Sequence, residues 1–216
     1  RGMSDGDRFA DRRDAGTRLA AALADRHGDV DRVVAIPRGG LPLGRAVADA
    51  LAAPLDVVVA KKIGAPHNPE YAIGAVATNG SVWRNESAIE RTGADEAYFE
   101  RERERVAEQS RKKAARYRGD ETEPPVAGER VVIVDDGAAT GATLHACLRQ
   151  LRAADAAHLT VAIPVAPPDT VDALAATADE VVCLSTPTNF QGVGQFYERF
   201  GQVTDEEAIA YLDAEP

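Results

Sequence analysis

The sequence predicts an α/β fold, with a mostly parallel, twisted sheet flanked by helices. Runs of apolar, β-branched residues occur at 31–36, 131–134 and 158–165, and such runs are typical of strands buried on both faces of a parallel sheet. Turn-forming residues and then an amphipathic helical pattern follow each run. Repeated strand–helix units of this kind place their loops at the carboxyl edge of the sheet, where open α/β sheets bind ligands.

The first part of the chain contributes two such strands. Four elements are expected there: a helix over 7–27 ending at Gly28, a strand over 31–36, a helix over about 42–52, and a strand over 55–63. The first strand runs directly into Pro37-Arg38-Gly39-Gly40, and the second ends in Lys61-Lys62. Both segments would therefore deliver cationic side chains to the carboxyl edge of the sheet.

An interruption of the sheet pattern follows, over residues 64–127. It opens with a turn-rich segment, and Asn79-Gly80 between two β-rich segments is a strong hairpin signal. A short helix is expected over 86–92. The segment 95–117 predicts a long helix whose charges alternate in sign, which favours an exposed covering helix over a partner-binding one. Residues 119–128 form the expected linker back to the sheet.

The stretch 131–151 carries the chemistry. Asp135 and Asp136 follow a buried strand, and a loop of small residues leads into a helix that opens near Thr143. Unpaired N–H groups and the positive end of the dipole let a helix N-terminus bind phosphate. Small residues allow the backbone to approach a ligand closely. The stretch therefore predicts a phosphate cradle beside two carboxylates.

Other phosphate and catalytic motifs do not fit this loop. Gly141 is followed by Ala142-Thr143 and not by the Lys of a Walker A loop, and neither GxGxxG nor GxSxG occurs there. The four histidines lack metal-ligand spacing, and His145 is interpreted as a surface or supporting residue more than a catalyst.

The C-terminal part completes the sheet. A strand over 158–165, a helix over 167–177 and a strand over 180–184 are expected, followed by a turn-rich aromatic tail. A last helix over 204–212 begins with a capping box, in which Thr204 caps the helix and Glu207 stands three residues later.

Composition narrows the possible partners. The 216 residues suffice for one α/β domain, and the formal net charge of −10 argues against general affinity for nucleic acid or anionic membranes. No apolar run approaches the roughly 18–20 residues that span a bilayer, and no signal peptide is apparent. Cys147 and Cys183 lie in apolar segments, which suggests reduced thiols in a cytoplasmic protein. The acidic, lysine-poor composition suggests a salt-adapted or high-GC organism.

The pattern over Val131–Thr143 resembles the phosphoribosyl pyrophosphate (PRPP) motif of type I phosphoribosyltransferases, although a branched apolar residue is commoner at Gly137. The Pro-Arg-Gly-Gly segment, the Lys-Lys strand end and the tail FQGVGQFYERFGQVTDE agree with this family. The chain is most similar to an uncharacterised group that carries PRGG, KKIGAPxNPExAIGA and VDDGxATGAT. The resemblance covers most of residues 31–205.

The resemblance implies a type I phosphoribosyltransferase fold with a hood or lid subdomain. One domain would span 1–216, with a core at about 1–63 and 128–185, an inserted lid or hood at about 64–127, and a C-terminal hood segment at about 186–216. It also implies a homodimer.

Site roles also follow from the resemblance. The 5-phosphate would bind the loop formed by Gly137, Ala138, Ala139, Thr140, Gly141, Ala142 and Thr143. Asp135 and Asp136 would be the catalytic pair: they would hold the ribose hydroxyls, bind Mg²⁺ directly, through water or through those hydroxyls, and stabilise the oxocarbenium-like ribose. Pyrophosphate would bind Arg38, the N–H groups of Gly39 and Gly40, and Lys61 or Lys62. Side chains alternate along a strand, so only one lysine is expected to face the site.

The implied activity is Mg²⁺-dependent transfer of a phosphoribosyl group from PRPP to a small nitrogenous acceptor, with release of pyrophosphate. Phe190 is the candidate for stacking on a base, a core aromatic being the alternative. Ala139 stands where members acting on 6-oxopurines have Asp, so those acceptors are disfavoured. Glu70 and Asp136 are open candidates for a general base. A non-catalytic PRPP- or nucleotide-sensing regulator on the same fold is the competing interpretation.

Overall fold

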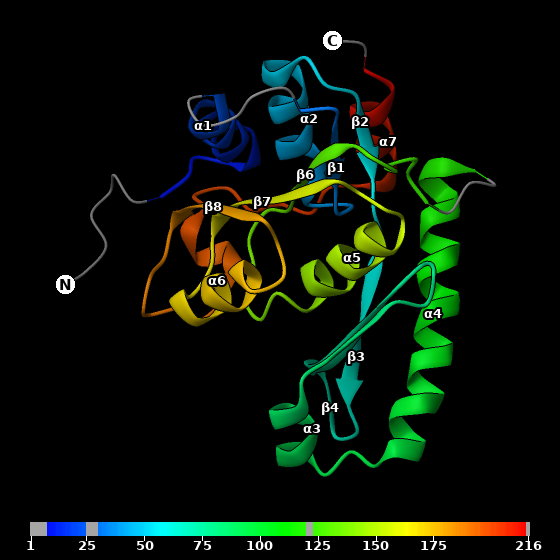
Figure 1. Ribbon diagram of the computed structural model, residues 1–216. Helices are drawn as coiled ribbons and strands as arrows, with labels where there is room; N and C mark the ends of the chain where they lie inside the picture. The colour runs from blue at the N-terminus through cyan, green and yellow to red at the C-terminus, as the bar shows by residue number, and fades with distance from the viewer. Residues whose placement is uncertain (1–7, 25–29, 120–122, 215–216) are drawn as a thin grey trace.

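A five-stranded parallel sheet forms the centre of the molecule (Figure 1). The computed structural model describes residues 8–24, 30–119 and 123–214. The strand order is β2-β1-β6-β7-β8. The strands are β1 (Arg32–Ala35), β2 (Leu55–Val57), β6 (Arg130–Val134), β7 (His158–Val165) and β8 (Glu180–Ser185). The parallel α/β architecture expected from the apolar runs is confirmed.

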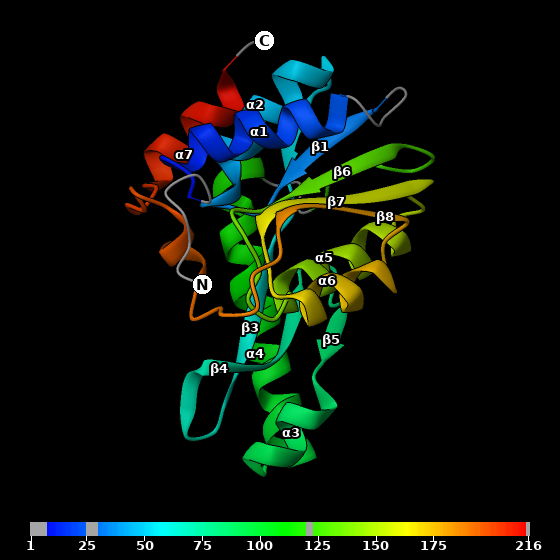
Figure 2. The ribbon, with the colours of Figure 1, turned by 90° about the vertical axis from the view of Figure 1, so that its left-hand side faces the viewer.

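Helices cover both faces of this sheet (Figure 2). One face carries α1 (Arg12–Ala24) and α2 (Gly40–Leu51), and the other carries α5 (Ala142–Ala153) and α6 (Pro168–Ala175). Side chains that alternate along a strand serve the two layers: in β6, Val132 and Val134 join the α1–α2 core, whereas Val131 and Ile133 join the α5 core. Burial on both faces explains why β6 reads as an unbroken apolar run.

A second, antiparallel sheet extends away from the first. It contains β3 (Ala60–Ala65), β4 (Asn68–Ala77) and β5 (Val82–Arg84), accompanied by α3 (Glu86–Thr92) and α4 (Glu96–Arg118). The single strand expected over 55–63 is therefore wrong, because β2 ends at Val57 and β3 pairs with β4. Val58 and Val59 are buried where the chain passes between the sheets, so the apolar run continues although the strand does not.

Local signals in this second sheet are confirmed. Gly80 has φ +85°, and the N–H of Ala77 donates to the carbonyl of Ser81 at 2.9 Å, which closes the Asn79-Gly80 hairpin. The turn-rich segment is shorter than expected, since only residues 66–67 separate β3 from β4. The charged helix α4 buries a stripe that includes Phe99 and Val106 against the sheet.

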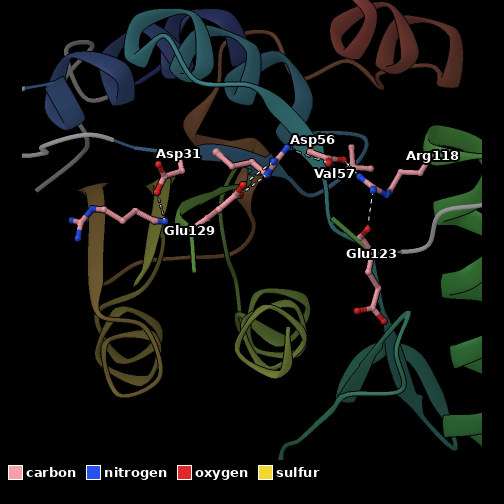
Figure 3. A network of polar contacts seen from close by, with 8 residues as sticks. Asp31, Asp56, Val57, Arg118, Glu123 and Glu129 are labelled. Atoms are coloured by element: carbon pink, nitrogen blue, oxygen red, sulfur yellow. Dashed lines mark hydrogen bonds and ion pairs between the residues drawn. The ribbon is translucent and has the colours of Figure 1, made fainter. Parts of the chain in front are cut away.

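Ion pairs join α4 to the amino ends of the central strands (Figure 3). Arg32 donates to both carboxylate oxygens of Glu129, at 2.7 and 2.9 Å. Asp56 accepts from Arg118 at the end of α4 and lies 3.8 Å from the guanidinium of Arg32. Arg118 also donates to the carbonyl of Glu123 at 2.8 Å. This network fixes the return of the chain to β6 at the edge opposite the predicted site.

The tail runs past the N-terminal segment. The 3-10 helix η2 (Val193–Phe196) leads into a bridge between Phe9 and Tyr197, and α7 (Asp205–Asp213) carries the predicted capping box. The predicted end of the first helix at Gly28 lies outside the described residues, as does part of the 119–128 linker. No described helix is long and apolar enough to cross a membrane.

Candidate active site

The acidic pair lies where predicted, at the carboxyl end of β6. The N–H of Asp136 donates to Oδ1 of Asp135 at 2.8 Å. Burial raises the pKa of both carboxyl groups, and the neighbouring charge of Asp136 raises that of Asp135 further. Two carboxylates that lie side by side and are buried from solvent strongly attract a cation or hydroxyl donors.

Neighbouring strands and helices hold the small-residue loop, which we define as residues 137–143. The N–H of Ala138 donates to the carbonyl of Val165 at 3.0 Å, which ties the loop to β7. Thr170, in the first turn of α6, donates its hydroxyl to the carbonyl of Ala139 at 2.7 Å. Gly141 has φ +69°, a conformation that glycine adopts without strain. The loop is therefore fixed from outside and leaves its inner face open.

That inner face presents unused donors. Within the described part of the chain, the N–H groups of Ala139, Thr140, Gly141 and Thr143 meet no hydrogen-bond acceptor. They lie at the N-terminus of α5, where the helix dipole also favours an anion. The arrangement is chemically suited to a phosphate group.

The loop and the acidic pair share one cavity, which we call the acidic cavity. Its volume is about 190 Å³. It is lined by residues 135–143, Lys62 of β3 and Val193 of η2. Predicted residues from two distant parts of the sequence are thus brought together with a hydrophobic residue of the tail.

The Pro-Arg-Gly-Gly loop, residues 37–40, packs directly against Asp136. The peptide bond between Pro37 and Arg38 is cis. A Cβ at Gly39 would lie 2.1 Å from Oδ2 of Asp136, so this position tolerates only glycine without a local shift. The N–H of Gly40 donates to the carbonyl of Ile36 at 3.0 Å. Contrary to expectation, Gly40 therefore offers no free N–H here, because it forms the first turn of α2.

The two adjacent lysines of β3 point to opposite sides, as strand alternation predicts. Lys62 lines the acidic cavity, whereas Lys61 donates to Oε1 of Gln109 at 3.0 Å on the α4 side. Lys61 and Arg38 line a second cavity there. The predicted pyrophosphate-binding residues are thus divided between two cavities.

Arg12 is a site residue that the sequence did not reveal. Its Nε lies 2.8 Å from Oδ2 of Asp136, and its guanidinium stacks 3.9 Å from the ring centroid of Phe200. Tyr197 donates its hydroxyl to the backbone carbonyl of Asp136 at 2.6 Å. The N-terminal helix and the tail together support this carboxylate.

Lys113 of α4 is a second residue that the sequence did not reveal. Its Nζ donates to the carbonyl of Pro37 at 2.5 Å. Burial and the neighbouring charges of Lys61 and Arg38 lower the pKa of its ammonium group, while Asp135 opposes them. In the sequence, Lys113 belongs to a charged helix that reads as solvated, so no signal distinguished it.

For two further candidates the surroundings favour one of the two alternatives that the sequence left open, a supporting residue for His145 and a core aromatic for Phe190. His145 is not a surface residue: it is 4% exposed and stacks on Trp83 at 5.0 Å between ring centroids. Burial lowers the pKa of His145 to about 4. Phe190 stacks on Phe196 at 5.2 Å, partly buried against the α1–α2 core, and does not line the acidic cavity. Its stacking role stays a prediction.

The two carboxylates of this site suit a hard cation whose remaining ligands come from a bound molecule and from water. No group of three or more His, Cys, Asp or Glu side chains clusters within the described residues. Mg²⁺ is commonly held in proteins by one or two carboxylates, with phosphate oxygens and waters completing its octahedron. Asp135 and Asp136 fit that mode of binding.

Comparison with known proteins agrees with this geometry. Residues 7–199 match the family described as "Phosphoribosyl transferase domain". The Mycobacterium tuberculosis (strain H37Rv) protein Rv0571c, whose name gives a provisional assignment as a phosphoribosyl transferase, is 44% identical over 206 residues. That match covers 95% of this chain and 46% of the relative, so the chain spans about half the length of the curated relatives it matches.

Solved structures share the fold. TT1426 from Thermus thermophilus is 45% identical, with a TM-score of 0.78 covering 95% of this chain and 97% of that one. AQ2163 from Aquifex aeolicus shares the fold at 13% identity and a TM-score of 0.50, covering 80% of this chain and 73% of that one. The chain belongs to the phosphoribosyl transferase domain family.

Proposed function

We propose that this domain binds PRPP with Mg²⁺ and transfers the phosphoribosyl group to a nitrogenous acceptor, releasing pyrophosphate. One observation carries the proposal: unused N–H groups of the small-residue loop, two carboxylates and Lys62 all line a single cavity. A phosphorylated sugar carries groups that complement each of these features. The proposal concerns this domain, and the activity of a longer protein that contains it would include whatever the rest contributes.

In this proposal the small-residue loop receives the 5-phosphate. The unused N–H groups are those of residues 139, 140, 141 and 143, and Thr140 and Thr143 add hydroxyls. Asp135 and Asp136 accept hydrogen bonds from the ribose hydroxyls. As the bond to pyrophosphate breaks, positive charge develops on the ribose ring, and the two carboxylates stabilise it electrostatically. The chain thus contributes mainly position and charge.

The leaving group would meet the Pro-Arg-Gly-Gly loop. The N–H groups of Arg38 and Gly39 have no acceptor among the described residues, in contrast to that of Gly40. The Lys62 ammonium group faces the same cavity as the acidic pair. Asp135 and Asp136 would hold Mg²⁺, and the chemistry that the ion would supply there is neutralisation of phosphate charge. Arg12 already engages Oδ2 of Asp136, which leaves Asp135 as the less encumbered carboxylate.

The second sheet and the tail would act as lid and hood over this site, excluding water from the reaction. The structural boundary lies at the start of β3, a few residues before the 64–127 insertion expected from the sequence. Ala139 continues to disfavour 6-oxopurine acceptors. Glu70 is exposed on β4 and Asp136 is paired with Arg12, so neither is favoured as a general base by its surroundings.

We extend the proposal to a cytoplasmic homodimer. Both Cys147 and Cys183 are free thiols, which supports a reducing compartment. The dimer rests on the family resemblance. Sedimentation velocity across a range of concentrations measures the oligomeric state, and a monomer at all of them would contradict this part.

Calorimetric titration with PRPP and Mg²⁺ tests the binding step. We expect binding by the unmodified protein and by an Asp172→Asn control, which alters an exposed carboxylate on α6. Asp135→Asn should abolish binding or turnover while the circular dichroism spectrum stays unchanged. If the unmodified protein binds no PRPP at all of the salt concentrations tested, the proposal is contradicted.

Pyrophosphate release across a panel of bases and amines then tests the transfer step. We expect at least one acceptor to support PRPP-dependent release. Tight PRPP binding without turnover on any acceptor would instead favour the sensing regulator, which uses the same cavity without chemistry.

A further inference from the structure

The side chain of His145 adjoins the small-residue loop from outside the acidic cavity. A Cβ built on Gly141 would lie 3.4 Å from Cδ2 and 3.5 Å from Nε2 of His145, so little space separates the ring edge from this glycine. The N–H of His145 also donates to the carbonyl of Gly141 at 2.8 Å. One residue in the first turn of α5 therefore supports the loop at Gly141 through both its backbone and its ring.

Two other elements hold the His145 ring in place. Trp83 of β5 stacks on its face, with 5.0 Å between the ring centroids and 10° between the ring planes, which is a favourable geometry for an aromatic pair. On its edge, Nδ1 lies 3.4 Å from the hydroxyl of Thr177, in the turn that follows α6. The second sheet thus contacts α5 at the residue that adjoins the loop (Figure 2).

The ring acts on the loop by its position and not by charge. Burial lowers the pKa of His145 to about 4, so the ring is neutral at neutral pH and exerts no net charge on a phosphate. Its Nε2 is buried and has no hydrogen-bond partner among the described residues. The support that the ring gives to Gly141 is therefore steric.

The loop needs such a support because its donors must converge on one ligand. The N–H groups of residues 139, 140, 141 and 143 are unused, and Gly141 has φ +69°, where a residue without a side chain is free to move. Thr170 fixes the loop at the carbonyl of Ala139, two residues before this glycine. Donors that are already in place bind more tightly, because less ordering is required on binding.

We propose that His145 is a positioning residue for the small-residue loop and that Trp83 holds it in place, so that the second sheet sets how tightly the loop binds a phosphate group. The inference rests on the proposed function, in which this loop receives the 5-phosphate. Arg149 makes a different contact between α5 and β5, since it donates to the carbonyl of Val82 further along the helix. A displacement of the second sheet would reach the loop through the stacked pair.

Amide hydrogen exchange, followed residue by residue by NMR, tests the positioning role without a ligand. The N–H of His145 donates to Gly141, so its exchange rate reports how firmly the loop is attached to α5. Trp83→Ala should speed this exchange about threefold or more, whereas Trp83→Phe keeps an aromatic face and should restore the rate of the unmodified protein. The N–H of Ala154, which donates to Gln150 at the other end of α5, should be unaffected. Equal acceleration at both amides, or none at His145, would overturn the proposal.

NMR titration with inorganic phosphate tests the consequence for binding. Trp83→Ala should raise the Kd for phosphate about threefold or more, and Trp83→Phe should restore it. The matched control Arg149→Gln loosens the same junction at Val82, the neighbour of Trp83, and should bind phosphate like the unmodified protein. Unchanged affinity in Trp83→Ala, or an equal loss in Arg149→Gln, would overturn the proposal.

A double variant tests whether Trp83 acts through His145. His145→Ala should weaken phosphate binding at least as much as Trp83→Ala, and the two changes together should weaken it no further than His145→Ala alone. Additive losses in variants with unchanged circular dichroism spectra would refute this route. Phosphate binding without PRPP binding would contradict the proposed function alone. If the unmodified protein binds neither, the proposed function fails and the exchange measurement decides the positioning role.

Discussion

Replacing Arg12 by methionine removes the cation beside Asp136 while keeping an unbranched, apolar side chain in its place. The two side chains are 13% and 16% exposed and their atoms lie 2.8 Å apart, so the pair is largely shielded from water. Breaking a fully buried pair costs about 3–5 kcal/mol, and residual solvent reduces this to about 2 kcal/mol. The lost stacking on Phe200 adds about 0.5–1 kcal/mol. We therefore expect a total loss of about 2–3 kcal/mol.

Urea unfolding measures this loss, and its pH dependence identifies the cause. Burial raises the pKa of Asp136 and Arg12 opposes that rise, so the variant should hold a proton on Asp136 up to a higher pH. Protonation removes the unpaired charge. The destabilisation should therefore be smaller at about pH 5 than at about pH 8.

A double-mutant cycle and a neighbouring variant complete the test. Asp136→Asn should be coupled to Arg12→Met by about 1–2 kcal/mol, because the two changes remove the same interaction. Arg13→Met makes the same chemical change one position along α1, where the side chain is exposed, and should cost little. Additive effects, or an Arg13→Met loss equal to that of Arg12→Met, would refute the reasoning.

Three further predictions concern the surroundings of the acidic cavity. Gly39→Ala places a Cβ 2.1 Å from Asp136, and this clash should lower the free energy of unfolding by about 1–3 kcal/mol, measured by thermal unfolding. The control Gly192→Ala has nothing within 4 Å of its Cβ and should leave stability unchanged. Equal effects of the two variants would contradict the clash. Thr170→Val removes the hydroxyl that donates to the small-residue loop, so it should lower the free energy of unfolding by about 1–3 kcal/mol and weaken phosphate binding. Unchanged phosphate affinity in titration calorimetry would show that this hydrogen bond does not hold the loop in its binding conformation. His145 should titrate in NMR spectra near its pKa of about 4, so its contribution to stability is lost as pH falls from about 6.5 towards that value. A midpoint near the ordinary histidine pKa would show that the imidazole ring is exposed to solvent.

Local physics made much of the fold predictable. The Asn79-Gly80 hairpin and the Thr204 capping box depend on residues a few positions apart, and both form. The sequence pattern could not place the break between β2 and β3, because Val58 and Val59 are as buried as the strands around them. An apolar run indicates only that its residues are buried, and residues stay buried where the chain passes from one sheet to the other.

The candidate site shows the same contrast between features that are local in the sequence, which could be predicted, and contacts between distant residues, which could not. The small-residue loop and the acidic pair are contiguous in sequence, and their shared cavity follows from one strand–loop–helix unit. Arg12 contacts a residue 124 positions away, and Lys113 contacts one 76 positions away. Lys113 belongs to a helix whose alternating charges predict exposure to solvent. Their roles depend on how helices pack over the sheet, which no local pattern contains.

The distribution of lysine makes the protein suited to covalent footprinting. The chain has lysine at only four positions, 61, 62, 112 and 113, and all four line the two cavities. Among side chains, an acylating reagent that targets amines is therefore directed to these cavities alone. Acylation of Lys62, read by mass spectrometry, would report occupancy of the acidic cavity. Acylation of Lys112 would report occupancy of the second cavity, which Lys61 and Arg38 also line. A single digest thus resolves which of the two sites a ligand protects.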